Sequence, residues 1–570
     1  MTAAICYALA LQSTSAAAAQ DQLGNLKDKV YGLLDDLVAQ GILAPEKAAE
    51  LSAPADVPVE SVVAAEPARP TPVAARGIEE EIVQPVIADA GRVIRVPYVP
   101  EFVKDEIRTE LRNELREDVM EDVIQTAARE HWGTPEALPG WLQRMSWFGD
   151  FRLRGDFARF ADENLGSGTY IDFQAINDQQ RFLTNPETFY NFTENRERLR
   201  MRVRLGLNVA ITDKLAATFR IATGSLDNPV SLNQTMGDAW NNKHFNLEQA
   251  NLTWRFGSTD WLTLRGGRMK QPFFSTDLVW DNDVNFDGFT AHLKFDYGSK
   301  LLGTENSAVY LMAGAFPLSI TETEIDDGQS NDKWLWAGQI GINQSFGDDT
   351  TFKLAAAYYH FSNIVGQLNL RPLQGFPDSR LLDWTAPGLV AKGNTMYAIK
   401  PDEFGNPVLF GLASDYHLVN ITGQIDLGYW DPFHIVLTGD VIRNIGYNED
   451  DVLARTGYDV RKRADGWSAR LDLGAKDISR LGDWRLFASY KYLQRDAMLD
   501  AYAESNFHQG GTNAKGWVLG GFLGVADDTY IGIQYFTADA IDGWNENLGP
   551  GTDDTPLGID VITLDLMTHF

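Results

Sequence analysis

Arginine and aspartate occur in this sequence at spacings that could bind or steer charged solutes. Arginine recurs at every second position from 198 to 204, and Arg152 and Arg154 repeat that spacing in an earlier stretch. Aspartates gather between 277 and 283. Because a guanidinium stays charged and its planar fork fits oxyanions, a row of arginines opposite carboxylates would create a transverse electric field. The candidate residues are Arg152, Arg154, Arg198, Arg200, Arg202, Arg204, Arg265, Asp277, Asp281 and Asp283.

The same groups could instead neutralise one another. We call the arginines at 152–154 and 198–204 the arginine wall. Asp150 and Asp156 flank Arg152 and Arg154, and pairing among these groups and the aspartates at 277–283 would fix the acidic segment to the arginine wall. The two interpretations are compatible, because a paired group still contributes to the field. Selectivity for phosphate is a narrower hypothesis, which the formal net charge of -30 disfavours. That charge also argues against nucleic-acid binding, which needs a cationic surface.

No pattern in the sequence indicates catalysis, a metal site or a cofactor. The 8 histidines include none in a Gly-x-Ser-x-Gly or His-Glu-x-x-His motif. The single cysteine, Cys6, falls in the apolar N-terminal segment, so a mature chain would hold neither a disulfide nor a thiolate ligand. We therefore expect no enzyme activity, no metal and no cofactor.

Alternating apolar and polar residues would place the arginines on one face of a strand. Between Arg196 and Ile211, aliphatic residues alternate with the arginines over a length greater than that of an ordinary soluble strand. The last stretch, Gly558 to Phe570, alternates in the same way and ends in an aromatic carboxylate. We count about sixteen such runs between Trp147 and Phe570, the number found in transmembrane barrels with an aqueous lumen.

Short and long connections alternate along this part of the chain. Short turns are predicted at 212–213, 257–260, 347–350, 430–432, 481–483 and 527–528. Long polar segments are predicted at 161–195, 224–243, 271–285, 319–332, 363–413, 444–464, 496–513 and 539–557. Bacterial barrels place tight turns in the periplasm and long loops outside. The pattern therefore predicts an all-β transmembrane antiparallel β-barrel, whose third long loop could fold into the lumen opposite the arginines.

Composition agrees with a barrel but does not by itself require one. The mean hydropathy is -0.24 with 44% hydrophobic residues, and beyond the N-terminus no apolar run is long enough for a membrane-spanning helix. Aromatic residues such as Trp147, Trp254 and Trp484 stand near the predicted short turns, as an interfacial girdle requires. A soluble β-sandwich ending on an amphipathic strand is the alternative, and the alternating connections favour the barrel.

The N-terminal part is organised differently, as a small α-helical region that we place in the periplasm. We divide the chain into a signal peptide (1–19), a helical hairpin (20–53), a Pro/Ala-rich linker (54–97), an amphipathic helix (98–132) and the barrel (145–570). The first segment is apolar and ends in Ala17–Ala19, which is typical of a signal peptidase site. Apolar residues recur from Val103 to Val123 as a narrow stripe, so this helix could form a coiled coil or lie on the barrel rim.

Three signatures carry a family resemblance. They are residues 33–51 (LLDDLVAQGILAPEKAAEL), residues 95–103 (RVPYVPEFV) and, within 265–288, the groups RGGRM, PF, STD, WD and DG. Together they resemble the putative-porin family of Gram-negative outer-membrane β-barrels. The resemblance implies a periplasmic N-terminal part followed by a barrel that passes solutes, as an oligomer.

We therefore expect a porin in the cell outer membrane that lets small hydrophilic solutes or ions diffuse passively. The expected partners are outer-membrane lipid and lipopolysaccharide, further copies of the chain, with a trimer as one arrangement, and the barrel-assembly machinery, for which Phe570 would be the signal. The alternative function is a tether between the outer membrane and the cell wall. In that case the N-terminal region would bind peptidoglycan and the barrel would serve as its anchor.

Overall fold

The computed structural model describes residues 144–570 except 167, 182–185, 299–303, 305, 322–331, 348, 375–381 and 544–554. Outside the described residues lie the predicted signal peptide, helical hairpin, linker and amphipathic helix. The tether hypothesis depends on these segments and therefore stays a hypothesis. Within the ranges described, none of the helices combines the length and the apolar character needed to span a membrane.

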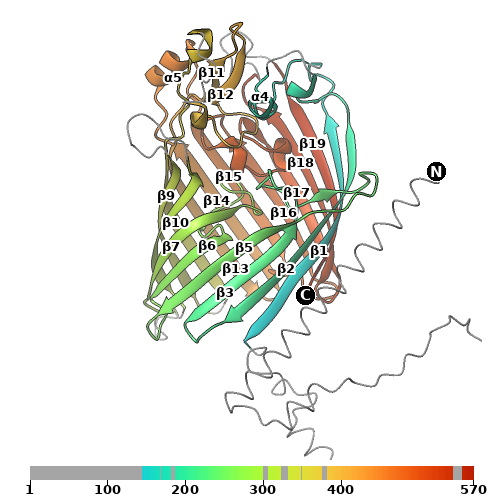
Figure 1. Ribbon diagram of the computed structural model, residues 1–570. Coiled ribbons are helices and arrows are strands. Elements are labelled where there is room, and N and C mark those ends of the chain that lie inside the picture. Colours follow the sequence, from blue (N-terminus) through green and yellow to red (C-terminus); the bar gives the residue numbers. More distant parts are fainter. Residues whose placement is uncertain are drawn as a thin grey trace, which may run out of the picture. The chain divides into compact units, whose positions relative to one another are not determined.

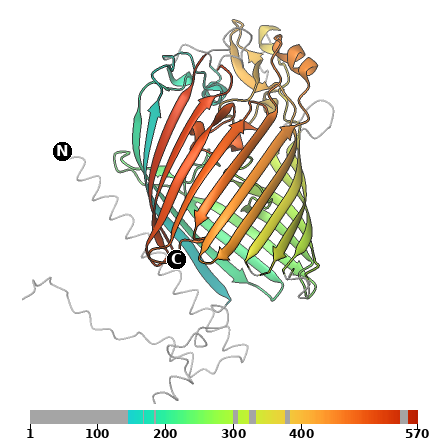
Figure 2. The ribbon, with the colours of Figure 1, turned by 180° about the vertical axis from the view of Figure 1, so that it is seen from behind.

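Long antiparallel strands form a closed barrel of sixteen strands, and the two-residue strand β4 adds a seventeenth member to the sheet (Figures 1 and 2). The predicted fold class is confirmed. The strands are β1 (Met145–Phe160), β2 (Arg196–Ala210), β3 (Leu215–Thr223), β4 (Gln234–Thr235), β5 (Phe245–Phe256), β6 (Leu262–Lys270), β7 (Asn285–Asp296), β8 (Ala308–Ser319), β9 (Lys333–Phe346), β10 (Thr350–Ser362), β13 (His417–Trp430), β14 (Phe433–Asn444), β15 (Asp465–Gly474), β16 (Trp484–Leu493), β17 (Ala514–Ala526), β18 (Thr529–Ala540) and β19 (Gly558–His569).

The first and last strands close the barrel. β1 pairs with β19 on one side and with β2 on the other. The terminal residue continues this ladder, because the backbone of Phe570 exchanges hydrogen bonds of 2.9 and 3.1 Å with Gly149. Closure leaves the sheet without a free edge. A free edge would be unfavourable in a bilayer, because its unpaired backbone groups would face lipid.

The alternation in sequence separates a lipid-facing surface from a lumen-facing one. In β1 and β2, Leu153, Leu199 and Leu205 are exposed on the outer surface, and the arginines between them point inward. Trp147, Trp254 and Trp484 are also exposed and stand beside the tight turns, where an aromatic girdle is expected. The register places the inward side chains opposite each other as Arg152 with Arg202, Arg154 with Arg200, Asp150 with Arg204 and Asp156 with Arg198.

Tight connections and long loops lie at opposite ends of the barrel, as predicted (Figure 1). Every predicted short turn is present, and the β7–β8 connection (297–307), which the sequence pattern did not reveal, joins the tight end. At the other end we name loop 1 (161–195), loop 2 (224–244), loop 3 (271–284), loop 4 (320–332), loop 5 (363–416), loop 6 (445–464), loop 7 (494–513) and loop 8 (541–557).

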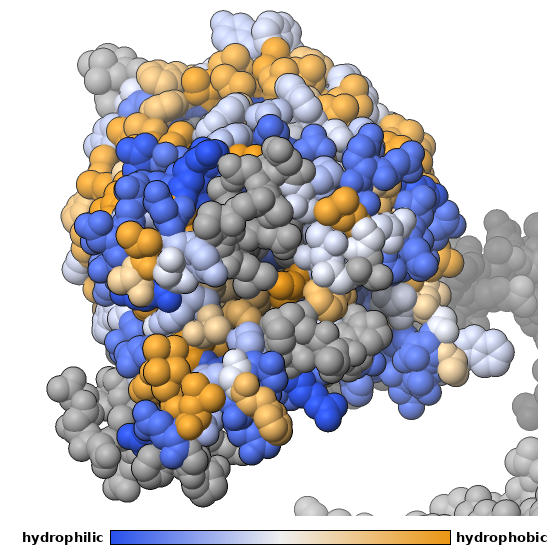
Figure 3. Space-filling model, turned by 90° about the horizontal axis from the view of Figure 1, so that it is seen from above, coloured by the Kyte–Doolittle hydropathy of each residue, from blue (hydrophilic) through white to orange (hydrophobic). Residues whose placement is uncertain are grey.

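The long loops contain secondary structure of their own. Loop 5 forms a separate two-stranded sheet from β11 (Met396–Pro401) and β12 (Pro407–Leu412). The helices are α4 (Phe173–Gln179) and α5 (Glu449–Thr456), with 3-10 turns η2 (Pro186–Thr188), η4 (Arg371–Gln374), η5 (Asp383–Thr385), η6 (Asp500–Tyr502) and η7 (Phe507–Gln509). Seen from the loop end, hydrophilic residues cover much of the surface, and hydrophobic residues gather at the outer edge of the barrel (Figure 3).

A hydrophobic core fills part of the lumen near the loop end. Apolar side chains of loops 1, 3, 5 and 7 pack against the inner faces of β8, β9, β10 and β13. Examples from the four loops are Ile176, Trp280, Phe410 and Leu499, each at most 5% exposed. The interpretation of these segments as simply polar is therefore wrong, because folding into the barrel lets them bury apolar surface while their polar residues face water.

Candidate pore constriction

Loop 3 crosses the lumen and attaches to several parts of the wall. Phe273 packs edge-on against Phe316 of β8 and Tyr359 of β10, with ring centroids 6.1 and 5.3 Å apart. The backbone of Phe274 exchanges two hydrogen bonds of 2.9 Å with the Gln339 side chain of β9. Thr276 donates hydrogen bonds of 2.6 and 2.9 Å to Asp440 of β14. These contacts hold the loop across the channel rather than outside it.

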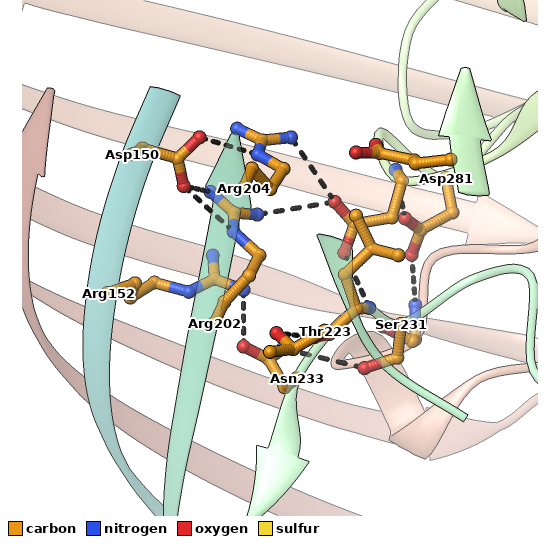
Figure 4. Close-up of polar contacts among 12 residues, drawn as sticks. Asp150, Arg152, Arg202, Arg204, Thr223, Ser231, Asn233 and Asp281 are labelled. Carbon is orange, nitrogen blue, oxygen red and sulfur yellow. Dashed lines mark hydrogen bonds and ion pairs between the residues drawn. The ribbon is translucent and has the colours of Figure 1, made fainter. Parts of the chain in front are cut away.

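The end of loop 3 is tied to the arginine wall through Asp283. Figure 4 shows Asp150, Arg202 and Arg204 of this wall together with Asp281 of loop 3. This carboxylate lies 3.3 Å from Arg202 and 4.0 Å from Arg204. Asp150 of β1 accepts hydrogen bonds from the same arginines at 2.9 and 2.5 Å. Burial alone would raise the pKa of Asp283, but the guanidiniums of Arg202, Arg152 and Arg204 lower it overall. Loop and wall are thus joined by a network of carboxylates and guanidiniums.

Two further arginines are held by partners on the wall and on the loops. Arg154 binds both carboxylate oxygens of Asp565 in β19 at 2.6 and 2.7 Å and also reaches Asn506 of loop 7. Its side chain is only 4% exposed. Arg152 donates a hydrogen bond of 2.5 Å to Asn233 of loop 2. These side chains fix the wall and its loops in place and offer little free surface to a solute.

Arg198 and Arg200 stand in a different environment. Both share one acid, Asp156, at 3.2 and 3.3 Å, and their side chains remain 34% and 15% exposed. They line a cavity of about 390 Å³ together with neutral polar groups of loops 2 and 7. Its lining also includes the carboxylates Asp172, Asp227 and Asp500 of loops 1, 2 and 7. A cavity of about 520 Å³ shares lining residues with it from loops 1, 2, 5 and 7. We call the two cavities together the vestibule.

The other predicted site residues do not face the arginine wall. Asp277 pairs with Lys491 of β16 at 2.8 Å. Asp281 accepts backbone hydrogen bonds from Ser505 of loop 7 and from Asp283, and burial together with the charge of Asp283 raises its pKa well above the usual range. Arg265 donates to Thr253 on β5. Because loop 3 spans the lumen, its successive carboxylates point to different walls, and only Asp283 meets the arginines.

Several residues of the site carry no recognisable signal in the sequence. Ser231 and Asn233 of loop 2 and Asn506 of loop 7 contact the arginines, but they come from polar stretches without periodicity. Asp565 could have been found, since its position in the alternating last strand gives it a lumen-facing side chain. For the part of the chain that the structure describes, no cluster of three or more potential metal ligands was found.

Among solved structures, the chain is similar to several outer-membrane proteins at low sequence identity. OprB of Pseudomonas putida at high pH is 13% identical with a TM-score of 0.40, and the match covers 75% of this chain and 95% of that one. The DcaP channel of Acinetobacter baumannii is 12% identical with a TM-score of 0.37, covering 75% and 97%. OmpF of Salmonella typhi in complex with daunomycin is 9% identical with a TM-score of 0.38, also covering 75% and 97%. No curated protein matches the chain.

A family model gives the more direct assignment. The model for the family described as Putative porin matches residues 27–570, which includes the whole barrel and most of the region before it. The family and the closed barrel are those of a channel in the outer membrane rather than of an enzyme. The chain therefore belongs to the putative-porin family and is a porin.

Proposed function

We propose that this porin lets small hydrophilic solutes diffuse passively and favours anions in the vestibule beside the arginine wall. The observation that carries the proposal is the pair Arg198 and Arg200, which line the vestibule while sharing the single carboxylate of Asp156. Two guanidiniums against one carboxylate leave an excess of positive charge on the strands of the wall, which faces the loop residues Asp172, Asp227 and Asp500 across the same cavity. Because both side chains are partly exposed, that charge acts on the solution inside the channel.

The acidity of the whole chain does not oppose this preference. Charges in solution are screened beyond about 10 Å at 0.1 M salt, so distant acidic residues contribute little to the field inside the lumen. Groups on the low-dielectric wall act on a nearby ion with less screening. An ion that passes along the wall therefore responds mainly to the charge of the wall itself, and on β1 and β2 at this level Arg198 and Arg200 stand against Asp156 alone.

The test is the reversal potential of single channels in a KCl gradient across a planar bilayer. Replacing both vestibule arginines, by Arg198→Gln and Arg200→Gln, is expected to shift the preference toward cations. Arg443→Gln is the matched control, because Arg443 pairs with Asp465 on the outer surface and its side chain is 66% exposed. An unchanged reversal potential in the double variant would overturn the anion preference, and a folded protein without conductance would overturn channel function itself.

The orientation of the chain follows from the same barrel. β1 begins at the tight-turn end, and Phe570 meets Gly149 at that end. Tight turns of bacterial barrels face the periplasm, so we infer that the N-terminal region lies in the periplasm. We also infer that the exposed Phe570 ring is available to the assembly machinery, and that lipid, lipopolysaccharide and further copies of the chain surround the apolar outer surface.

A further inference from the structure

Aromatic rings and arginines form a continuous strip on the lumen side of β15 to β18. We call Arg470, Arg485, Phe487, Phe522 and Tyr530 the stacking strip. Their inward direction follows from the register, because Phe522 stands opposite Gly532 and Gly532 stands opposite the lumen-facing Asp565. The strip lies on the arc of the wall that precedes β19 and β1, outside the cluster formed by Arg198 and Arg200.

The two phenylalanine rings lie flat against the barrel wall. Their centroids are 5.9 Å apart with an interplanar angle of 17°, so they form one nearly planar apolar surface. Glycines make this possible, since a Cβ atom would lie 2.3 Å from the Phe487 ring at Gly520 and 2.7 Å from the Phe522 ring at Gly532. Tyr530 meets Phe522 edge-on at 5.6 Å and extends the surface.

An arginine side chain lies over each of the two phenylalanine rings. The guanidinium carbon of Arg470 lies 3.8 Å from the Phe487 centroid, and that of Arg485 lies 5.2 Å from the Phe522 centroid. Asp472 holds Arg470 with two hydrogen bonds of 2.7 Å. Arg485 is held less completely, because a single hydrogen bond of 3.0 Å, from Nη1 to the Lys476 carbonyl, ties its guanidinium to the described residues and leaves Nη2 as a donor. A donor and an aromatic surface are therefore adjacent at Arg485 and Phe522.

We propose that the stacking strip is a transit site for aromatic carboxylates. The carboxylate of such a solute would accept hydrogen bonds from Arg485, and its ring would lie against Phe522 and Tyr530. An aliphatic acid of similar size has the charge but no π-face, and a neutral aromatic has the ring but no charge. This proposal rests on the proposed function in one respect, namely that solutes enter the channel. The transit site does not require the anion preference set by Arg198 and Arg200.

A purely structural role for the strip would have a different signature. Arginine stacked on phenylalanine also stiffens a wall, and in that case the strip would not distinguish solutes by their ring. The discriminating probes are benzoate, cyclohexanecarboxylate and benzyl alcohol. The first two have the same charge and nearly the same size, whereas the first and third share the aromatic ring.

The experiment records single channels of the full-length protein in a planar bilayer with each probe added to the same KCl solution. We expect benzoate to interrupt the current with residence times about three-fold longer than those of cyclohexanecarboxylate, and benzyl alcohol to cause no resolved interruption. Phe522→Leu and Arg485→Gln are each expected to remove the advantage of benzoate. Phe289→Leu is the control, because that ring is 70% exposed on the outer surface.

Equal residence times for benzoate and cyclohexanecarboxylate in the unmodified protein would overturn the proposal, and this comparison needs no folded variant. An undiminished advantage of benzoate in Phe522→Leu would overturn it as well. The reversal-potential test in KCl is independent of both readouts. A failure of the anion preference therefore leaves the residence-time comparison valid, and a failure of the strip leaves the anion preference standing.

Discussion

At the scale of single residues, neighbouring arginines on one strand have different tasks because their partners differ. Arg202 is 6% exposed as a side chain and touches both Asp150 and Asp283, whereas Arg198 is 34% exposed and shares Asp156. A guanidinium that is enclosed by carboxylates mainly holds those carboxylates, and the strands or loops that bear them, in position. One that still faces solution contributes to the field that a solute meets.

Arg202→Gln is expected to destabilise the barrel and loosen loop 3 more than it changes ion preference. The substitution leaves Asp150 with Arg204 alone and weakens the hold on Asp283, and removing one partner of a buried ion pair costs about 3 kcal/mol. The measurement is thermal unfolding in detergent together with current noise in single channels. Arg198→Gln is the comparison, and equal melting temperatures and noise for the two variants would contradict the division of roles.

At the scale of elements, the long loops hold one another through buried polar contacts. Lys392 of loop 5 donates a hydrogen bond of 2.7 Å to the carbonyl of Gly510 in loop 7 and lies 2.8 Å from the ring of His508. Asp500 of loop 7 accepts hydrogen bonds from the backbone of Ala391 and Asn394. The loop end is therefore a packed structure, and its stability should depend on the protonation of these groups.

Attachment of loop 5 to loop 7 is expected to strengthen as the pH rises from about 7 toward 10.5. Burial lowers the pKa of Lys392 to about 7 from an ordinary value of 10.5, so in this window the open state binds a proton that the closed state lacks. Stability rises with pH wherever the unfolded state binds more protons. The readout is the rate of proteolysis in loop 5 as a function of pH.

Lys392→Met should flatten that alkaline dependence, while Lys462→Met, at an exposed position of loop 6, should leave it intact. Asp500 adds a dependence of the opposite sign at lower pH. Burial raises its pKa to about 6 from 3.8, so the closed state holds the extra proton there and attachment weakens as the pH rises through that window. A proteolysis rate without any slope above pH 7 would argue against a buried Lys392.

At the scale of the whole molecule, the barrel closes only when its last strand, β19, pairs with its first strand, β1. The pairing of β19 with β1 joins residues that lie far apart in the chain; Arg154 and Asp565, for example, are 411 positions apart. Contacts of such sequence separation form late and slowly, because loop closure must be completed before they are made. The terminal residue is therefore placed where it can influence assembly more than conduction.

Deleting Phe570 is expected to lower the yield of folded barrel several-fold and to leave the conductance of the channels that do form unchanged. The deletion removes the backbone hydrogen bonds with Gly149 and an exposed ring, but no lumen-facing side chain. The folded fraction can be measured as the heat-modifiable band on a gel, and conductance in a planar bilayer. A normal folded fraction with altered conductance would show that the residue belongs to the channel instead.

Local pattern accounts for much of this fold. The two-residue period of β2 predicted both its lipid-facing and its arginine-bearing surface, and the spacing of turns predicted which end of the barrel is tight. The positions of the arginines in the lumen could be read from parity alone. The contact of Asp283 with the wall was within reach of the same reasoning, whereas the partners of Asp277, Asp281 and Arg265 were not, because they depend on where loop 3 crosses the lumen.

What the sequence by itself determined is the barrel: its strands, which of its ends carries the tight turns, and the side of the wall on which the charged residues of the strands lie. These follow from periodicity, which acts between neighbouring residues. Only the tertiary structure decided which arginines are locked and which face solution, how loops 1, 3, 5 and 7 fill the lumen, and that glycines lie opposite the rings of the stacking strip. The physical reason is that these features join side chains from strands and loops far apart in the chain, whose meeting depends on the shape of the closed barrel rather than on any local pattern.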